Sequence, residues 1–346
     1  MNKCDYETKK ILKKLLTEGC PDINPRPYYE DKYYKATKHY DAKGNLIELK
    51  TTNGEIVKIN TDVQEIKEID DTIIVHTPAH TYSYNHEMVT YDLSKGEFPL
   101  STLRPTAIKS AIAEIIWIYV IQSSDLVIFD ELLGKNTWNE NHKINNWWEE
   151  WALRDNNGNY ILNDAGHPHI GCCYGETIRR HNLIEKLLTG IKENPDGRRH
   201  IINMWQEDDF KNPHGLKPCA YQTVWNVRHT KKGDLLDMCL FQRSSDFCTA
   251  GVINQAQYAV LLLMVAAHTG YKPGKFTWFV DNIQCYDRHI LQANEMLSRE
   301  PIECRPFVKV LKNDFFSLTP DDIIIENYPI EEIKKKNPQL KFDIAI

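Results

Sequence analysis

The chain of 346 residues is long enough for one large domain or two modest ones. Hydrophobic residues make up 42% and charged residues 26%, a balance that excludes wholesale disorder and predicts a sizeable core. Because 48 acidic residues outnumber 42 basic ones, the net charge of −6 argues against a broad nucleic-acid-binding face. Any bound anion must therefore sit in a local basic pocket.

The sequence shows no targeting or metal-binding pattern. No apolar run approaches the ~20 residues that a membrane helix needs, and the first 16 residues, MNKCDYETKKILKKLL, contain no apolar signal segment. The nine cysteines are scattered, without a CxxC pair or a zinc-binding spacing. We therefore expect a cytoplasmic protein in a reducing compartment, with no membrane contact and no bound metal.

The first half of the chain mixes helical and strand-like patterns. Residues 5–19 have helical spacing, with apolar residues on one side and lysines on the other. Residues 27–85 are rich in Tyr, Lys, Thr and Asp, and Asn53-Gly54 signals a hairpin between strand-like runs, so this stretch predicts a β-rich insertion. Residues 106–122 predict a buried helix, and tryptophans crowd residues 138–151.

The second half again mixes the two patterns without regular alternation. The predicted helices lie at 181–194, 254–269 and 287–298, and the predicted strands at 198–205, 220–229, 235–243 and 275–281. No internal repeat or linker divides the chain. Residues 1–346 therefore predict a single α+β domain.

Cys219 stands between a proline and a predicted strand, in the run Lys-Pro-Cys-Ala. A small buried cysteine is the ordinary interpretation of such a residue. The alternative is a nucleophile held at a strand start, which needs a nearby cation to stabilise its thiolate. Arg243, on a neighbouring strand-like run, is the candidate cation, and together with Ser244 it could grip a phosphate.

Glu114 is the single acid in an otherwise apolar helical run. Burying a carboxylate without a partner is costly, so the residue either faces a polar site or has a raised pKa that suits general acid–base chemistry. A place on the wet face of an amphipathic helix is the other interpretation. Its helical neighbours Ala111, Trp117 and Ile118 weaken that interpretation.

Other residues suit recognition of a flat ring and a sugar. Trp147, Trp148 and Trp151 could form a stacking wall, or they could be core aromatics. Asn254 offers both a donor and an acceptor at the start of an apolar helix, or it could be a plain N-cap. Tyr286 could offer its hydroxyl to a sugar, although a packing tyrosine is the default.

In their order along the chain these residues resemble the thymidylate synthase family, the folate-dependent kind with a catalytic cysteine. The resemblance covers roughly residues 86–346. It rests on the Phe-Pro-Leu stretch before Arg104, the Asp-Gly-Arg-Arg-His-Ile-Ile run at 196–202, the Pro-Cys pair, the Arg-Ser-x-Asp run at 243–246 and the apolar tail Asp-Ile-Ala-Ile. It implies a mixed twisted sheet that forms a dimer interface, with helices on the other face.

The resemblance also implies a reaction. Cys219 would attack C6 of the uracil ring of dUMP, and Glu114 would manage proton transfers through ordered water. The co-substrate would be 5,10-methylenetetrahydrofolate, the products dTMP and dihydrofolate, and no metal or nucleic acid would be required. Asn254 would read the uracil edge. The implied enzyme is a thymidylate synthase, a methyltransferase of dTMP biosynthesis.

The implied site residues form three overlapping sets. The catalytic set is Cys219, Glu114, Arg243, Asp246 and Asn254. The set that binds dUMP is Arg26, Arg198, Arg199, Gln242, Arg243, Ser244, Asp246, Asn254, Gln284 and Tyr286, with Arg198 and Arg199 reaching the phosphate across a homodimer interface. The set that binds the folate is Arg104, Trp148, Trp151, Leu216, Asp246 and Ile346, at the end of a tail that closes over the site.

Two departures from the family pattern leave an alternative open. Gln284 stands where the family usually has His, and the run Ala-Gly-Val-Ile at 250–253 replaces Gly-Leu-Pro-Phe. A dUMP hydroxymethylase would use the same cysteine and folate, with water trapping the methylene. Cytosine-specific relatives carry Asp at the place of Asn254, so Asn254 favours uracil. A non-catalytic nucleotide- or RNA-binding homologue would need neither Cys219 nor Glu114.

Overall fold

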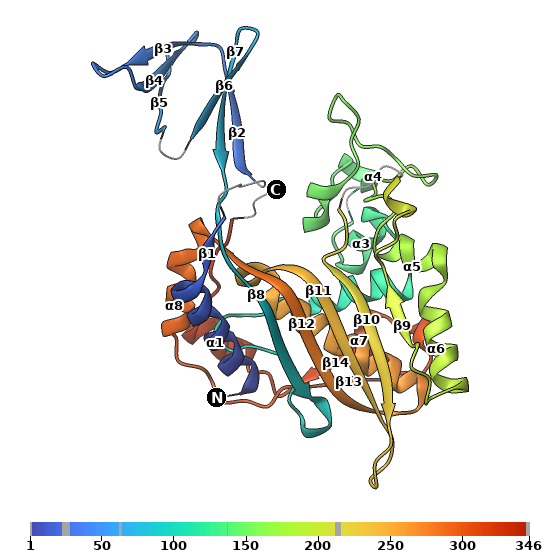
Figure 1. Ribbon diagram of the computed structural model, residues 1–346. Helices are drawn as coiled ribbons and strands as arrows, with labels where there is room; N and C mark the ends of the chain where they lie inside the picture. The colour runs from blue at the N-terminus through green and yellow to red at the C-terminus, as the bar shows by residue number, and fades with distance from the viewer. Residues whose placement is uncertain (1, 23–27, 62–63, 137, 212–215, 344–346) are drawn as a thin grey trace.

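The computed structural model describes residues 2–22, 28–61, 64–136, 138–211 and 216–343 (Figure 1). Its centre is a six-stranded sheet in the order β1-β8-β12-β11-β10-β9. These strands are β1 (Cys20–Pro21), β8 (Thr81–Asp92), β9 (Ile201–Asn203), β10 (Ala220–Arg228), β11 (Leu235–Asp246) and β12 (Lys272–Tyr286). β11 and β12 run parallel, whereas β10–β11 and β8–β12 are antiparallel, so the sheet is mixed.

Helices cover one face of this sheet and its two ends (Figure 1). They are α1 (Lys3–Glu18), α2 (Ile108–Ile115), α3 (Leu126–Leu132), α4 (Trp138–Asn141), α5 (Gly175–His181), α6 (Leu183–Glu193), α7 (Val252–Thr269), α8 (Ile290–Ser298) and α9 (Ile330–Lys336). α7 packs on β11, β12 and α2. By length and composition Phe247–Thr269 could cross a membrane, but 72% of its most apolar window is buried inside the protein, as in a core helix.

The core lies between the sheet and α7. Alternate residues of β12 are buried, which is the pattern of a strand with one face against a core. Trp225 on β10 and Trp278 on β12 are among the largest fully buried side chains, together with Trp117 beyond α2. Burial of such aromatic side chains stabilises the fold by about 2–3 kcal/mol each.

The strands between β1 and β8 form two small sheets that project from the body (Figure 1). One contains β2 (Tyr28–Tyr34), β7 (Thr72–Pro78) and β6 (Glu65–Ile69), and the other β3 (Ala36–Tyr40), β4 (Leu46–Thr51) and β5 (Ile56–Lys58). They share a core of Leu49, Ile59, Ile73 and Val75. As predicted from Asn53-Gly54, a turn joins β4 to β5, and Gly54 adopts a left-handed φ of 88°. A last antiparallel pair, β13 (Phe307–Val310) and β14 (Ile323–Glu326), comes late in the sequence.

Several element boundaries differ from the sequence prediction. The helix expected at 181–194 is α6, which begins at Leu183 directly after Asn182 with its φ of 50°, and a separate helix, α5, precedes it. The helix expected at 106–122 ends as α2 and continues as a π-helical turn, Ile116–Val120. The strand expected at 198–205 shrinks to β9. β12 extends to Tyr286, and this extra length carries Gln284 to the end of the sheet.

Candidate active site

One cavity of about 460 Å³ lies where α2, the start of α7 and the ends of β10, β11 and β12 meet. It gathers most of the predicted site residues. These are Glu114, Trp148, Trp151, Leu216, Cys219, Gln242, Ser244, Asp246, Asn254, Gln284 and Tyr286. The cavity has the size and the mainly apolar walls of a small-molecule site with a few polar groups.

Cys219 is held at the cavity wall by the residues around its backbone. Its N–H donates to the Tyr174 hydroxyl at 2.9 Å, and its carbonyl accepts from the Arg243 N–H at 2.9 Å. Burial raises the pKa of the Cys219 thiol, and the positive charge of Arg243 lowers it. A guanidinium beside a buried thiol favours the thiolate, which is the nucleophilic form. Arg243 therefore lies close enough to act on the Cys219 thiol, while burial, the larger effect, keeps the pKa of this thiol above its usual value.

The Arg243 guanidinium also holds the loop in front of the nucleophile. Nε donates to the Pro218 carbonyl at 3.1 Å, and Nη2 donates to the Lys217 carbonyl at 2.9 Å. Arg243 is not among the residues that line the cavity, but Ser244 beside it is. The arginine thus fixes the approach to Cys219 while its charge lies next to the cavity.

Glu114 reaches the cavity from α2 and is only 8% exposed. Burial raises the pKa of its carboxyl to about 7, although hydrogen bonding by Gln257, Trp148 and Trp147 acts in the opposite direction. A carboxyl with such a pKa exists in both protonation states near neutral pH, as a general acid or base requires. The interpretation of Glu114 as a solvent-facing helix residue is wrong.

Asn254 lies in the first turn of α7, and it is not the N-cap, which is Gly251. Its Oδ1 accepts from Gln242 Nε2 at 3.1 Å, and its Nδ2 donates to Gln257 Oε1 at 3.0 Å. Gln242 is 2% exposed. The amide of Asn254 is therefore held from both sides, and one donor and one acceptor site remain for a ring.

Asp246 ends β11 and caps the π-helical turn that leads into α7. Its carboxylate accepts from the Thr249 hydroxyl and lies 3.9 Å from His289 Nδ1. Burial raises the pKa of Asp246, which the Thr249 hydrogen bond opposes. The turn needs glycine at 251, because a Cβ there would lie 2.4 Å from the Phe247 ring.

The comparisons with known proteins agree with this geometry. The family model described as thymidylate synthase matches residues 60–346. The chain is 43% identical to a thymidylate synthase of Lactococcus lactis subsp. cremoris over 262 residues, which are 75% of this chain and 84% of the relative. It is 35% identical to the Streptococcus mutans thymidylate synthase over 349 residues, the full length of both. The chain belongs to the thymidylate synthase family.

A solved structure shows the same fold. The thermostable thymidylate synthase A from Bacillus subtilis superposes with a TM-score of 0.70 and 25% identity, over 99% of each chain. The predicted α+β fold of this family, with a mixed sheet and helices, is thereby confirmed. The chain is accordingly an enzyme of the methyltransferase class.

Some of the residues predicted for the thymidylate synthase site do not line this cavity. Arg104 does not line the cavity; its Nη2 donates to the Cys248 and Thr249 carbonyls at 2.7 and 2.8 Å, and it stacks on Phe342 at 4.9 Å. Arg198 and Arg199 are exposed before β9 and are also outside the cavity of their own protomer. Arg26 and Ile346 lie outside the described residues.

Two cavity residues, Gln257 and Tyr174, received no predicted role, although Tyr174-Gly175 is part of the family-like order of residues along the chain. Gln257 lies one turn beyond Asn254 on α7, and this i+3 spacing was the available signal. Tyr174 has a left-handed φ of 46°, and nothing in its sequence context predicted that its hydroxyl would reach Cys219. Within the described ranges, no group of three or more His, Cys, Asp or Glu residues could hold a metal ion.

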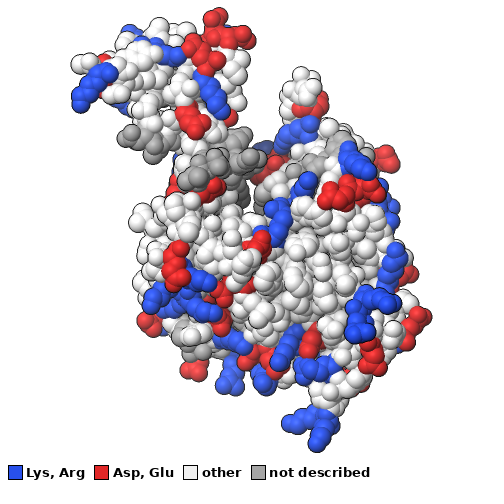
Figure 2. Space-filling model, viewed as in Figure 1, with Lys and Arg blue, Asp and Glu red and all other residues white. Residues whose placement is uncertain are grey.

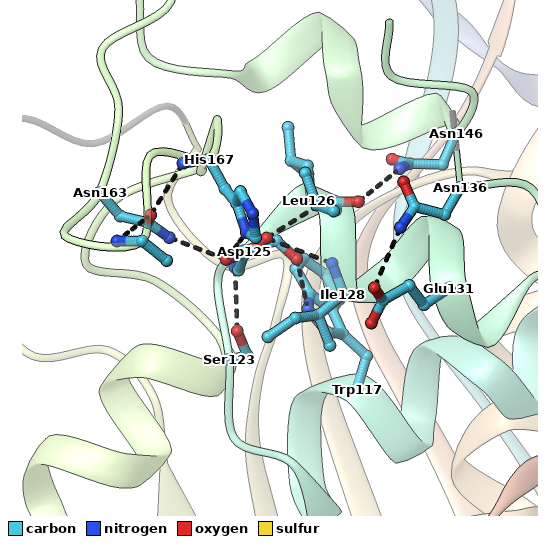
Figure 3. Close-up of polar contacts among 12 residues, drawn as sticks. Trp117, Ser123, Asp125, Leu126, Ile128, Glu131, Asn136, Asn146, Asn163 and His167 are labelled. Atoms are coloured by element: carbon cyan, nitrogen blue, oxygen red, sulfur yellow. Dashed lines mark hydrogen bonds and ion pairs between the residues drawn. The ribbon is translucent and has the colours of Figure 1, made fainter. Parts of the chain in front are cut away.

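The tryptophan wall of this family member is a short 3-10 helix, Trp147–Trp151. Trp148 contacts Trp117, Trp151 and Tyr174 at centroid distances of 5.8, 5.5 and 5.2 Å. Asn146 anchors the wall, because its amide donates to the Leu126 carbonyl and to Asp130 and accepts from the Trp148 N–H. Figure 3 shows Asn146 reaching toward Leu126 at the start of α3.

Asp125 holds the start of α3 in place (Figure 3). Its carboxylate accepts from the Val127 and Ile128 N–H groups at 2.8 and 3.2 Å and contacts Asn163 Nδ2 and His167 Nδ1, both at 2.9 Å. Asp125→Ala removes an N-cap and two side-chain partners, so we expect a loss of about 3 kcal/mol in the free energy of unfolding. Urea unfolding followed by tryptophan fluorescence measures it.

The matched control is Asp164→Ala, an exposed aspartate on the same loop as Asn163. We expect it to leave the unfolding midpoint unchanged, because surface substitutions have effects within about 0.5 kcal/mol. Equal midpoints for the two variants would contradict the role given to Asp125.

Proposed function

We propose that this chain makes dTMP from dUMP with 5,10-methylenetetrahydrofolate, through covalent attack of Cys219 on C6 of uracil. The observation that carries this proposal is the shared cavity of Cys219, Glu114 and Asn254. It combines a thiol with a neighbouring guanidinium, a carboxyl that titrates near neutrality and an amide that matches uracil. The folate supplies the one-carbon unit and the hydride, and leaves as dihydrofolate.

The first step is addition of the thiolate to the ring. The sulfur electron pair forms the bond to C6, the C5–C6 π electrons move to C5 and O4, and C5 becomes nucleophilic. Asn254 Nδ2 retains one hydrogen for O4, where negative charge develops. Glu114 exchanges protons with the ring carbonyl through water, since its pKa of about 7 lies near the operating pH.

The cavity fits the folate ring on chemical grounds. Trp148 and Trp151 offer aromatic faces, Leu216 an apolar side chain and Asp246 a carboxylate that accepts N–H donors. These four residues are the proposed pterin contacts. Arg104 supports the folate site indirectly, because it hydrogen-bonds the backbone carbonyls at 248–249 and stacks on Phe342 of the C-terminal tail.

The same tail is docked by His289, whose Nε2 hydrogen-bonds the Asp343 carbonyl at 2.8 Å. This docking supports closure of the site by the following residues, with Ile346 at the end. Gln284 and Tyr286, which line the cavity, are the proposed contacts to the sugar. Gln284 can donate to a hydroxyl but cannot carry a proton as histidine does.

The phosphate is proposed to bind Arg243, Ser244 and Gln242 of one protomer and Arg198 and Arg199 of a second, with Arg26 as a further cation. The face of the sheet away from α7 supports such a homodimer. On it Met88, Phe279 and Phe241 stand in register on β8, β12 and β11, and Met88 is 63% exposed. Figure 2 shows this face as largely uncharged, which suits burial against a second copy.

Subunit complementation tests the shared site. Cys219→Ser in one chain and Arg198→Ala with Arg199→Ala in the other should each give nearly inactive homodimers. In a hybrid, one site has an intact Cys219 and both arginines, so a 1:1 mixture should regain about a quarter of wild-type activity if dimers form at random. The measurement is dTMP formation after the two chains are co-expressed or refolded together. Failure to regain activity would contradict the shared site.

The overall activity is tested by incubating the protein with dUMP and methylenetetrahydrofolate. Formation of dihydrofolate, seen by its absorbance change, together with dTMP supports the synthase. A hydroxymethylated nucleotide with release of tetrahydrofolate would overturn the proposal in favour of a hydroxymethylase. The names of the relatives favour the synthase.

We also propose a single catalytic domain over residues 1–346, into which residues 27–85 are inserted. α1 supports this organisation, because it precedes the small sheets and still packs on α8 and β8 of the body. All nine cysteines of the sequence are free, which supports a cytoplasmic location.

A further inference from the structure

A row of hydrogen-bonded side chains crosses the floor of the cavity. Trp278 Nε1 on β12 donates to Gln242 Oε1 on β11 at 2.8 Å. Gln242 Nε2 donates to Asn254 Oδ1 at 3.1 Å, and Asn254 Nδ2 donates to Gln257 Oε1 at 3.0 Å. The Gln257 side chain in turn hydrogen-bonds Glu114. The row therefore joins the base-reading amide to a buried indole at one end and a carboxyl at the other.

The direction of the hydrogen bonds in this row is set at Gln242, whose amide is oriented by the Trp278 indole and by the Ser244 carbonyl. An amide can present either its oxygen or its nitrogen to a neighbour, and the partners decide which. The indole N–H of Trp278 can only donate, so the oxygen of Gln242 must face it. The nitrogen of Gln242 then faces Asn254, and its second hydrogen goes to the Ser244 carbonyl at 2.9 Å.

This direction decides which pyrimidine Asn254 can bind. Its amide oxygen is left to accept from N3–H of uracil, and its amide nitrogen is left to donate to O4. Cytosine has an acceptor at N3 and an amino donor at C4, so it requires the flipped amide. A flip would set two nitrogens of Asn254 and Gln242 against each other, and two oxygens of Asn254 and Gln257, which leaves buried polar groups unpaired.

We propose that Trp278 determines the preference for uracil over cytosine by locking the amides of Gln242 and Asn254 in one orientation. Trp278 is fully buried and does not line the cavity, so it is a positioning residue that acts through Gln242. The inference rests on the proposed function, because it assumes that Asn254 binds the base. It adds the origin of the selectivity, which Asn254 alone does not supply.

The test is Trp278→Phe, which keeps an aromatic ring and removes the N–H. Dissociation constants for dUMP and dCMP are measured by equilibrium titration, and kcat/KM by dihydrofolate formation with each nucleotide. Loss of one buried donor should narrow the ratio of the two affinities by about tenfold, because one of the two groups that orient the Gln242 amide is removed. The loss should appear in KM and Kd more than in kcat.

The matched control is Trp225→Phe. Trp225 is equally buried on the neighbouring strand β10, and its N–H donates to the Thr223 hydroxyl at 2.8 Å, outside the row. We expect Trp225→Phe to leave the ratio of the dUMP and dCMP affinities unchanged. A ratio in Trp278→Phe equal to that of Trp225→Phe, even with weaker binding of both nucleotides, would overturn the proposal.

A second variant covers the case in which Trp278→Phe fails to fold. Gln257→Leu removes the acceptor for Asn254 Nδ2 at the other side of the amide, so the ratio should narrow there too. An unchanged ratio in this variant would overturn the inference. Failure of the proposed function is separate, because it would appear as absence of dTMP formation by the wild-type protein.

Discussion

Replacing Cys219 by serine is expected to abolish dTMP formation and to leave dUMP binding intact. Serine has nearly the same size, so the hydrogen bonds of the Cys219 backbone to Tyr174 and Arg243 should persist. Its hydroxyl is a far weaker nucleophile without a base to activate it, so kcat should fall by a factor on the order of 10³ or more. Dihydrofolate formation and equilibrium binding of dUMP measure the two properties separately.

The matched control is Cys20→Ser, at an exposed cysteine on the short edge strand β1. This variant should retain wild-type kcat, which separates loss of the nucleophile from general effects of thiol replacement. A Cys219→Ser protein with kcat within tenfold of wild type would sink the covalent mechanism. A Cys219→Ser protein that keeps its full function in the cell would also contradict this mechanism, because a protein that only binds nucleotides needs no thiol.

Glu114→Gln is expected to make the protein more stable and nearly inactive. The pKa of Glu114 is raised from 4.5 to about 7 by burial, so between these pH values the folded state holds more protons than the unfolded state. Stability from this group is therefore lost as pH rises from 4.5 to 7, by up to about 3 kcal/mol. Glutamine cannot ionise, so Glu114→Gln should recover much of that loss at pH 8 and none at pH 4.

Although Glu114→Gln should be more stable than wild type, its activity should be lower. Loss of a positioned general acid and base typically costs a factor of about 10² to 10⁴ in rate, and the pH dependence of kcat near pH 7 should disappear with it. Urea unfolding at pH 4 and pH 8 measures stability, and dihydrofolate formation between these pH values measures activity. Lower stability of Glu114→Gln at pH 8 would show that the carboxylate is well solvated or paired there.

Glu87→Gln provides the comparison, since Glu87 on β8 is also buried. Unlike Glu114, it has cationic partners, with Lys10 and Lys14 at 3.3 and 3.5 Å. Removing its charge breaks these ion pairs, so the variant should be no more stable than wild type at any pH, and its kcat should not change. The contrast isolates the effect of burying a carboxylate without a cation.

Much of the fold could be predicted from local patterns. The apolar run of α7 and the alternating pattern of β10 reflect the 3.6- and 2-residue periods of helix and strand. Errors arose where a local conformation departs from the period. A left-handed φ of 50° at Asn182 separates the predicted helix, α6, from α5, which was not predicted. Pairing with β8 and β11 extends β12 well past its apolar segment.

The chemistry of the candidate site was also present in the residue order. Three reactive residues can each be recognised from the local sequence: Cys219 after a proline, Glu114 in an apolar helix and Asn254 before an apolar run. A local sequence pattern does not indicate which hydrogen-bond partner each of these side chains has in the folded protein. Gln257 hydrogen-bonds Asn254 and lowers the pKa of Glu114, but only its spacing from Asn254 indicated such a role in the sequence. Arg104, predicted to bind the folate, instead donates to backbone carbonyls and does not line the cavity.

The sequence by itself thus determined which reactive groups this protein has and the family to which they belong, because residue types and their spacing are local properties. Only the tertiary structure decided how these groups are set. A buried indole 24 residues beyond Asn254 in sequence meets Gln242 across two strands, and this contact orients the amide that faces the base. Hydrogen-bond direction depends on which donors and acceptors folding brings together, and spacing along the chain does not contain that information.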